Sequence, residues 1–123
     1  YAAVHGVVGE LLYAKNFFIA LLEGDWIVFP YAVDERDPLA RFEPRKPGLS
    51  RTDHVLGTQK PLLASRESLD RLNETGVVRT VGTPSVCWLG VPLRGETGPL
   101  GVMAVQSYSP DTVYDETDQE VLT

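Results

Sequence analysis

Two pairs of long apolar segments, each pair joined by a short glycine-containing turn, constrain the fold of this chain more than any other feature. "NFFIALL" (16–22) and "WIVFPYAV" (26–33) flank Glu23-Gly24-Asp25, and the runs within "VCWLGVPLRGETGPLGVMAVQSYS" (86–109) flank "RGETG". Apolar runs around such turns predict β-hairpins, whose strands are antiparallel. Because these runs are too continuously apolar to leave one side wet, we expect a sheet that is covered on both faces.

Helical patterns surround these hairpins. Apolar residues recur at helical spacing over 1–12, which predicts an amphipathic helix, and 115–123 reads as a final helix capped by Asp115 or Thr117. Between the hairpins we expect a long loop, a short helix with Ser50 as its N-cap, a short strand in "KPLLAS" and a second short helix in "SRESLDRLNETG". Helices gathered outside antiparallel strands indicate the α+β class.

The length and the net charge of the chain limit the number of domains and the kinds of partner that we expect. The 123 residues suffice for one domain, and the net charge of −6 disfavours binding to nucleic acid or to an anionic membrane. No apolar run approaches the roughly 18 residues of a membrane span, and no signal peptide is visible. The chain starts without Met inside one helical pattern and stops inside another. We therefore expect residues 1–123 to be a single domain with truncated terminal helices, taken from a longer protein.

Several strings, in this order and spacing, resemble a GAF domain. "KNFFIAL", "IVFPYAVDE" and "GLSRTDHVLGTQKPLLA" are similar to the first two strands and to the helix and short strand that follow. "VCWLGVPL" and "PLGVMAVQSYSPDTVYDETDQEVL" are similar to the last two strands and the final helix. The strings resemble those in GAF domains of bacterial sensor histidine kinases and diguanylate cyclases, and the likeness covers nearly all of 13–123.

The resemblance implies a central six-stranded antiparallel sheet, with the terminal helices on one face and with loops and short helices over a pocket on the other. It also implies a cytoplasmic regulatory domain that senses an unknown small molecule and homodimerises through its terminal helices. Such a domain passes its signal to an output domain, a histidine kinase of a two-component system or a diguanylate cyclase. The alternative is a ligand-free structural module that serves dimerisation and signal relay.

Cys87 is the only cysteine, and its role is either chemical, as a reactive thiol, or structural, as a core residue. A reactive thiol needs access and a lowered pKa, whereas Cys87 lies within an apolar strand without a nearby His or Lys, so we interpret it as a core residue. Bilin attachment in related photoreceptors uses Cys followed by His, but His54 follows Asp53 here. Free methionine sulfoxide reductases of this superfamily use cysteine pairs. We therefore predict no enzyme activity and no bilin or haem attachment, and the cofactor stays unknown.

A cyclic-nucleotide motif of related domains is matched only in part. Asp34-Glu35 is present, but Pro30 stands where the motif has Phe, Phe29 lies one position too early, and Lys15-Asn16 is in reversed order. We interpret this match as chance and the loop from Asp34 as ordinary solvated surface.

Other charged residues give little support for a site. The long loop contains four basic residues, Arg36, Arg41, Arg45 and Lys46. They could recruit an anionic ligand or partner, but we favour the interpretation that they form a solvated surface. The two histidines have no Cys or His at ligand spacing, so no metal site is predicted.

Strand alternation offers the remaining clue. Asn16 shares one side of its strand with Phe18, and Gln106 shares one side of the last strand with Ala104. Buried polar groups need hydrogen bonds, so these two face a ligand pocket or bond to strand ends and loop backbone. Rigid aromatic residues could line the same pocket, with plain core packing as the alternative. The candidate ligand-binding residues are Asn16, Phe18, Phe29, Tyr31, Trp88 and Gln106.

Overall fold

The protein is an α+β domain built on one antiparallel sheet. The computed structural model describes residues 2–11, 14–34, 44–46, 48, 51–65, 68, 71, 74, 86–96, 98–109 and 112–122. Within them the elements follow in the order α1 (Ala2–Leu11), β1 (Phe17–Glu23), β2 (Trp26–Val33), α2 (Arg51–Thr58), β3 (Leu62–Ser65), β4 (Cys87–Gly95), β5 (Gly98–Ser107) and α4 (Glu116–Leu122).

Both predicted hairpins and the short strand are confirmed. The strand order is β2-β1-β5-β4-β3, so β1 and β5 lie side by side and join the two hairpins into one sheet. All four pairings are antiparallel. The described residues form five strands, and none of them supplies the sixth strand that the resemblance implied.

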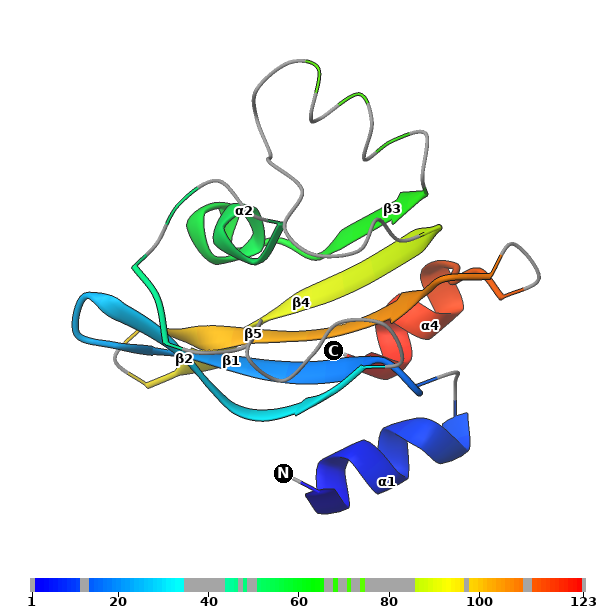
Figure 1. Cartoon of the computed structure of the whole chain (residues 1–123), viewed down its shortest axis with the longest axis horizontal. Helices are drawn as coiled ribbons and strands as arrows, with labels where there is room; N and C mark the ends of the chain where they lie inside the picture. Colours follow the sequence, from blue (N-terminus) through cyan, green and yellow to red (C-terminus); the bar gives the residue numbers. More distant parts are fainter. Residues whose placement is uncertain are drawn as a thin grey trace.

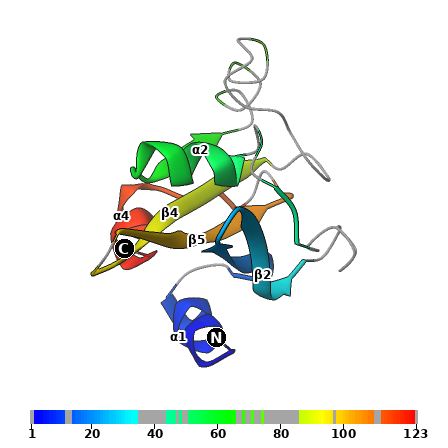
Figure 2. The ribbon, with the colours of Figure 1, turned by 90° about the vertical axis from the view of Figure 1, so that its left-hand side faces the viewer.

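Alternate residues of the central strands feed two separate cores. Phe17, Ile19, Leu89 and Val105 pack on one face together with Val8 of α1 and Leu122 of α4. On the other face a second cluster includes Val55 of α2. Figure 1 shows α2 on one side of the sheet and α1 on the other, and the turned view of Figure 2 agrees. The sheet is covered on both faces, as the unbroken apolar runs predicted.

The ends of the short helices have recognisable local causes. Asp115 accepts a hydrogen bond from the backbone N–H of Asp118 at 3.0 Å, and Asp118 returns one to the N–H of Asp115 at 3.0 Å. This reciprocal cap confirms Asp115 as the start signal of α4. Gln59 closes α2 in the left-handed region at φ 56°, and its N–H donates to Val55 O. Ser50 lies outside the described residues, as does most of the helix expected over 65–76.

Cys87 and Trp88 point to opposite faces of β4. Cys87 is buried in the cluster beneath α1 and α4, and its Sγ accepts a hydrogen bond from the N–H of Tyr114 at 3.5 Å. Burial raises the pKa of the Cys87 thiol, and the Tyr114 N–H offsets this only in part. Trp88 lies in the cluster beneath α2, so the two neighbours serve different cores.

His5 fastens α1 to the sheet. Its Nε2–H donates to the backbone oxygen of Ala14 at 2.6 Å, and its Nδ1 therefore accepts from the Tyr31 hydroxyl at 2.7 Å when the ring is neutral. The imidazole also stacks on Phe17, with ring centroids 4.6 Å apart and planes 1° from parallel. A single side chain of α1 thus contacts β1 and β2 together.

Gly90 makes room for the Trp88 indole. The indole, on the same face of β4, lies across Gly90 so closely that a Cβ there would stand 2.3 Å from its Cη2. Any side chain at position 90 must therefore move Trp88, which is only 1% exposed.

We predict that Gly90→Ala destabilises the domain by about 1–3 kcal/mol, because overpacking displaces a buried indole. Urea unfolding measures the loss, and the fluorescence of Trp88 in a Trp26→Phe background reports its displacement. Gly6→Ala is the matched control, because a Cβ at Gly6 meets nothing within 4 Å and Ala favours a helix. Equal stability of the Gly90→Ala variant and the parent would contradict this packing.

We also predict that Tyr31→Phe loosens α1, because it removes the hydroxyl that bonds His5. The expected cost is about 1 kcal/mol, seen as faster amide hydrogen exchange in α1. Ser65→Ala, which removes an exposed hydroxyl on β3 that bonds only locally to Ser68, should leave α1 exchange unchanged. Equal acceleration in both variants would show that His5 and Tyr31 do not hold α1 specifically.

Candidate functional site

Trp88 and Gln106 form the centre of the candidate site on the α2 face. They are direct neighbours across β4 and β5, and both are almost fully buried, at 1% and 3% exposure. Phe18, also a sequence candidate, belongs to the same cluster as Trp88 and packs edge-on against Phe29 with ring centroids 5.7 Å apart. The structure therefore brings these four candidates to one face of the sheet.

Asp34 is a functional candidate that the sequence interpretation missed. Its carboxylate accepts a hydrogen bond from Gln106 Nε2 at 2.9 Å and from the Tyr108 hydroxyl at 2.8 and 2.9 Å. It stands directly after β2, yet it bonds to β5 and to the residue after it, so its contact passes across β1. The expectation of an ordinary solvated loop is wrong for Asp34. No local pattern pairs Asp34 with Tyr108, so only the strand order reveals this contact.

Asn16 and Gln106 differ in how their amides are used. Asn16 Nδ2 donates to the backbone oxygen of Gln106 at 3.1 Å, which favours the strand-end alternative for Asn16. The Gln106 amide is oriented by its bond to Asp34, and this leaves Oε1 buried without a hydrogen-bond partner among the described residues. Buried polar atoms in folded proteins nearly always have a partner, so this oxygen calls for an explanation.

Arg51, at the start of α2, is the second residue that the sequence interpretation missed. It is buried, and its guanidinium lies over the Trp88 ring with Cζ 5.5 Å from the centroid. Such a cation–π contact is stronger when it is shielded from water. The guanidinium therefore covers the indole face that a ligand would need.

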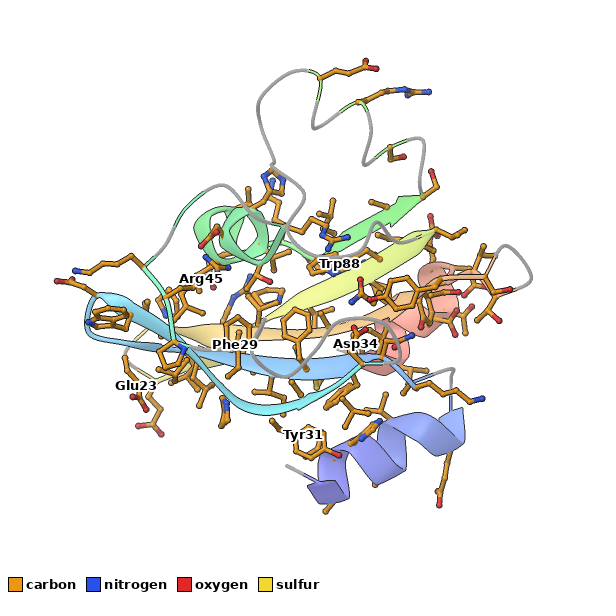
Figure 3. The ribbon with its side chains drawn as sticks, in the orientation of Figure 1. Glu23, Phe29, Tyr31, Asp34, Arg45 and Trp88 are labelled. Carbon is orange, nitrogen blue, oxygen red and sulfur yellow. The ribbon has the colours of Figure 1, made fainter. Side chains whose placement is uncertain are left out.

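Tyr31 is separated from the other candidates. Regular alternation would put it on the same side as Phe29, but the pairing of β2 with β1 shifts between Val28 and Tyr31, where β2 carries one extra residue. Because a bulge reverses the alternation, Phe29 packs towards α2 and Tyr31 towards α1. Figure 3 shows the Tyr31 ring on the α1 side and Trp88 between α2 and the sheet.

Arg45 is also more than a solvated loop residue. Its guanidinium forms an ion pair with Asp53 of α2 at 3.1 Å and lies 6.0 Å from the Phe29 ring centroid. Its backbone pairs with Ile27 of β2. Arg45 thus connects β2 to α2 on the candidate-site face. Lys46 lies over Trp26, while Arg36 and Arg41 fall outside the described residues.

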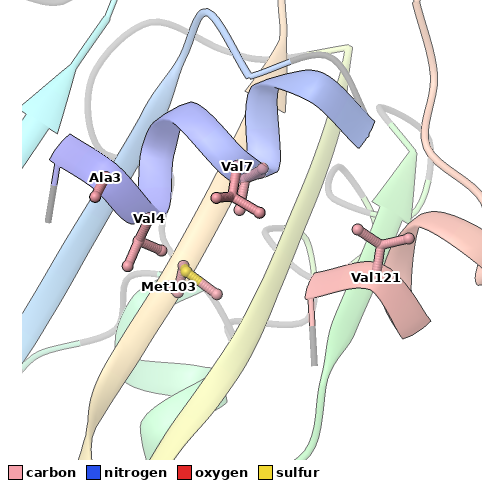
Figure 4. Close-up of a pocket in the computed structure, with 6 residues that line it drawn as sticks. Ala3, Val4, Val7, Met103 and Val121 are labelled. Atoms are coloured by element: carbon pink, nitrogen blue, oxygen red, sulfur yellow. The ribbon is translucent and has the colours of Figure 1, made fainter.

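Two apolar grooves lie on the opposite face. One, of about 380 Å³, runs between α1 and α4 over β5 (Figure 4). The other, of about 440 Å³, continues from Val4 along the sheet to Leu100 and Arg94. They share Val4 and Met103, so they form one continuous apolar surface beside the terminal helices.

Two further classes of site find no support in the described ranges. No three His, Cys, Asp or Glu side chains there gather closely enough to hold a metal ion. No helix of the described residues combines the length and the apolarity needed to cross a membrane.

The comparisons with known proteins concern the fold. No family model and no curated protein matches the sequence. Among solved structures, the GAF domain of a two-component sensor histidine kinase from Bacillus halodurans superposes with a TM-score of 0.64 at 12% identity. The match covers 98% of this chain and 82% of that one.

Two other neighbours act on or bind small molecules. A type II free methionine-R-sulfoxide reductase from Thermoplasma acidophilum matches with a TM-score of 0.73 at 12% identity, over 98% of this chain and 79% of that one. NreA from Staphylococcus aureus, described with a nitrate binding site, matches with a TM-score of 0.63 at 14% identity, over 93% and 86% of the two chains. At these identities the likeness establishes the architecture: the chain has the fold of a GAF domain.

Proposed function

We propose that this chain is the small-molecule-sensing domain of a cytoplasmic bacterial signalling protein and that it binds its ligand on the α2 face. The ligand would bias the arrangement of the terminal helices and thereby an output domain, a histidine kinase or a diguanylate cyclase. The observation that carries the proposal is the hydrogen-bonded group of buried Gln106 with the half-buried Asp34 and Tyr108, beside Trp88 on a largely apolar sheet face. Apolar surroundings with a few convergent polar groups are typical of small-molecule sites.

The contacts around β2 supply a route from that face to α1. Asp34 follows the last residue of β2 and bonds to Gln106, while Tyr31 in the same strand bonds to His5. A displacement of Asp34 would therefore reach α1 through three residues of one edge strand. Among the described strands β2 pairs only with β1, apart from the single bridge of Ile27 to Arg45, and a strand paired on one side can move more easily than a central one.

Thiol chemistry fits this chain less well, although a neighbour with the same fold is a reductase. Cys87 is buried beneath α1 and α4, on the other side of the sheet from the Gln106 group, and burial raises the pKa of its thiol. A nucleophilic cysteine needs the opposite conditions, an accessible sulfur and a lowered pKa. We therefore favour a regulatory rather than a catalytic role.

The sensing proposal predicts that at least one compound of a broad metabolite panel raises the unfolding temperature. A ligand that binds only the folded chain adds about 2.7 kcal/mol to the free energy of unfolding at about 100 times its Kd. Trp88→Phe should reduce the shift, whereas Val113→Glu, at an exposed position outside the described grooves, should not. If no compound of the panel raises the unfolding temperature, the sensing proposal fails.

A second candidate function, dimerisation through the terminal helices, is favoured by the exposed apolar surface. Val7 is 60% exposed, and Val4 and Val121 beside it also face solvent along the groove of Figure 4. Between Ala2 and Gly9 the helix carries no acidic or basic side chain other than His5, so the α1 side of this surface adds no acidic repulsion between two copies of this chain. A second copy is therefore the occupant that we propose, related by a two-fold axis that pairs like surfaces.

Dimerisation predicts a concentration-dependent dimer of this chain in sedimentation velocity experiments. Val7→Glu should shift the equilibrium to monomer, because it places a charge in an apolar contact. Val113→Glu is the matched control, since Val113 is 62% exposed and does not line the groove. A monomer at every concentration, or an equal effect of both substitutions, would argue against this surface.

A further inference from the structure

The unpartnered Gln106 oxygen indicates what kind of group the proposed ligand carries. Gln106 is 3% exposed and its Nε2 donates to Asp34, so within the described part of the chain Oε1 is an acceptor that lacks a donor. A group that donates a hydrogen bond would complete the amide. A second acceptor placed beside Oε1 would instead add repulsion to an unsatisfied site.

The charges nearest to Gln106 favour the same kind of group. The Asp34 carboxylate lies 2.9 Å from Gln106 Nε2 and is negatively charged when ionised. An anionic ligand group at Oε1 would therefore meet two oxygen acceptors, one of them charged. A neutral or cationic N–H donor would be stabilised by both.

The surroundings of Trp88 indicate the shape of the ligand's donor group. Its ring already carries the Arg51 guanidinium, with Cζ 5.5 Å from the centroid. A guanidinium is flat, cationic and rich in N–H donors, so the protein itself shows which chemistry this indole face accepts. Gly90 keeps the indole flat against the sheet, next to Gln106.

We propose that the ligand presents a planar nitrogen donor group, such as a carboxamide, amidine, guanidine or amino-heterocycle, which stacks on Trp88 in place of the Arg51 guanidinium and donates to Gln106 Oε1. This inference rests on the proposed sensing function and specifies its ligand class. Arg51 lies at the start of α2, so its release from Trp88 would also free the first turn of that helix.

Two pairs of probes that differ in one group test the ligand class: nicotinamide against nicotinate, and benzamidine against benzoate. Titration calorimetry and thermal unfolding of the chain should detect nicotinamide or benzamidine and neither carboxylate. Gln106→Leu should weaken the donor probe about tenfold, which is the loss of one hydrogen bond to a buried acceptor. Gln119→Leu, on α4 at the other face, is the matched control and should change nothing.

Arg51→Met provides a second test that does not depend on the folding of the Gln106 variant. If the guanidinium occupies the ligand's place, this variant should bind the donor probe several-fold more tightly than the parent. If the parent instead binds the carboxylate probes and Arg51→Met loses that binding, Arg51 recognises an anion. This result would overturn the proposed ligand class but would leave the sensing function intact. If neither nicotinamide nor benzamidine binds, the proposed ligand class is also overturned. The broad metabolite panel tests the sensing function separately.

Discussion

The alternation of side chains along three adjacent central strands is the constraint on which the rest of this structure depends. In β1, β5 and β4, odd-numbered residues such as Phe17, Val105 and Leu89 face α1 and α4, and even-numbered ones such as Phe18 and Trp88 face α2. Each strand therefore contributes to two cores at once. The antiparallel pairing keeps this alternation in register across the regular part of these three strands, so there the position of a residue in the chain sets the face of its side chain.

This division gives the two faces different chemistry. The face beneath α1 and α4 is apolar, holds Cys87 and continues into exposed valines, which suits packing against helices. The α2 face gathers the buried polar residues Gln106 and Arg51 around one indole. A binding group and an interaction surface can thus lie back to back on one small sheet without competing for the same side chains.

The bulge in β2 lets one strand contribute side chains to both faces of the sheet. By inserting one residue, it turns Phe29 towards α2 and Tyr31 towards α1, although only Pro30 separates them. Proline lacks an N–H and is tolerated on an edge strand or at a bulge, which are the conditions at position 30. The irregularity therefore gives a single edge strand contacts in both cores.

The sequence by itself determined the two hairpins, the burial of the sheet on both faces, the helix started by Asp115 and the core role of Cys87, because hydrophobic periodicity, turn residues and caps are local signals. Only the tertiary structure decided the partners of the polar residues. Asp34 meets Gln106 and Tyr108 across an intervening strand, and His5 meets Tyr31, over separations of 72, 74 and 26 residues. Tyr31 lies on the face opposite to the expected one, because the extra residue of the β2 bulge reverses the alternation of the side chains that follow it. No local sequence pattern marks the position of this bulge.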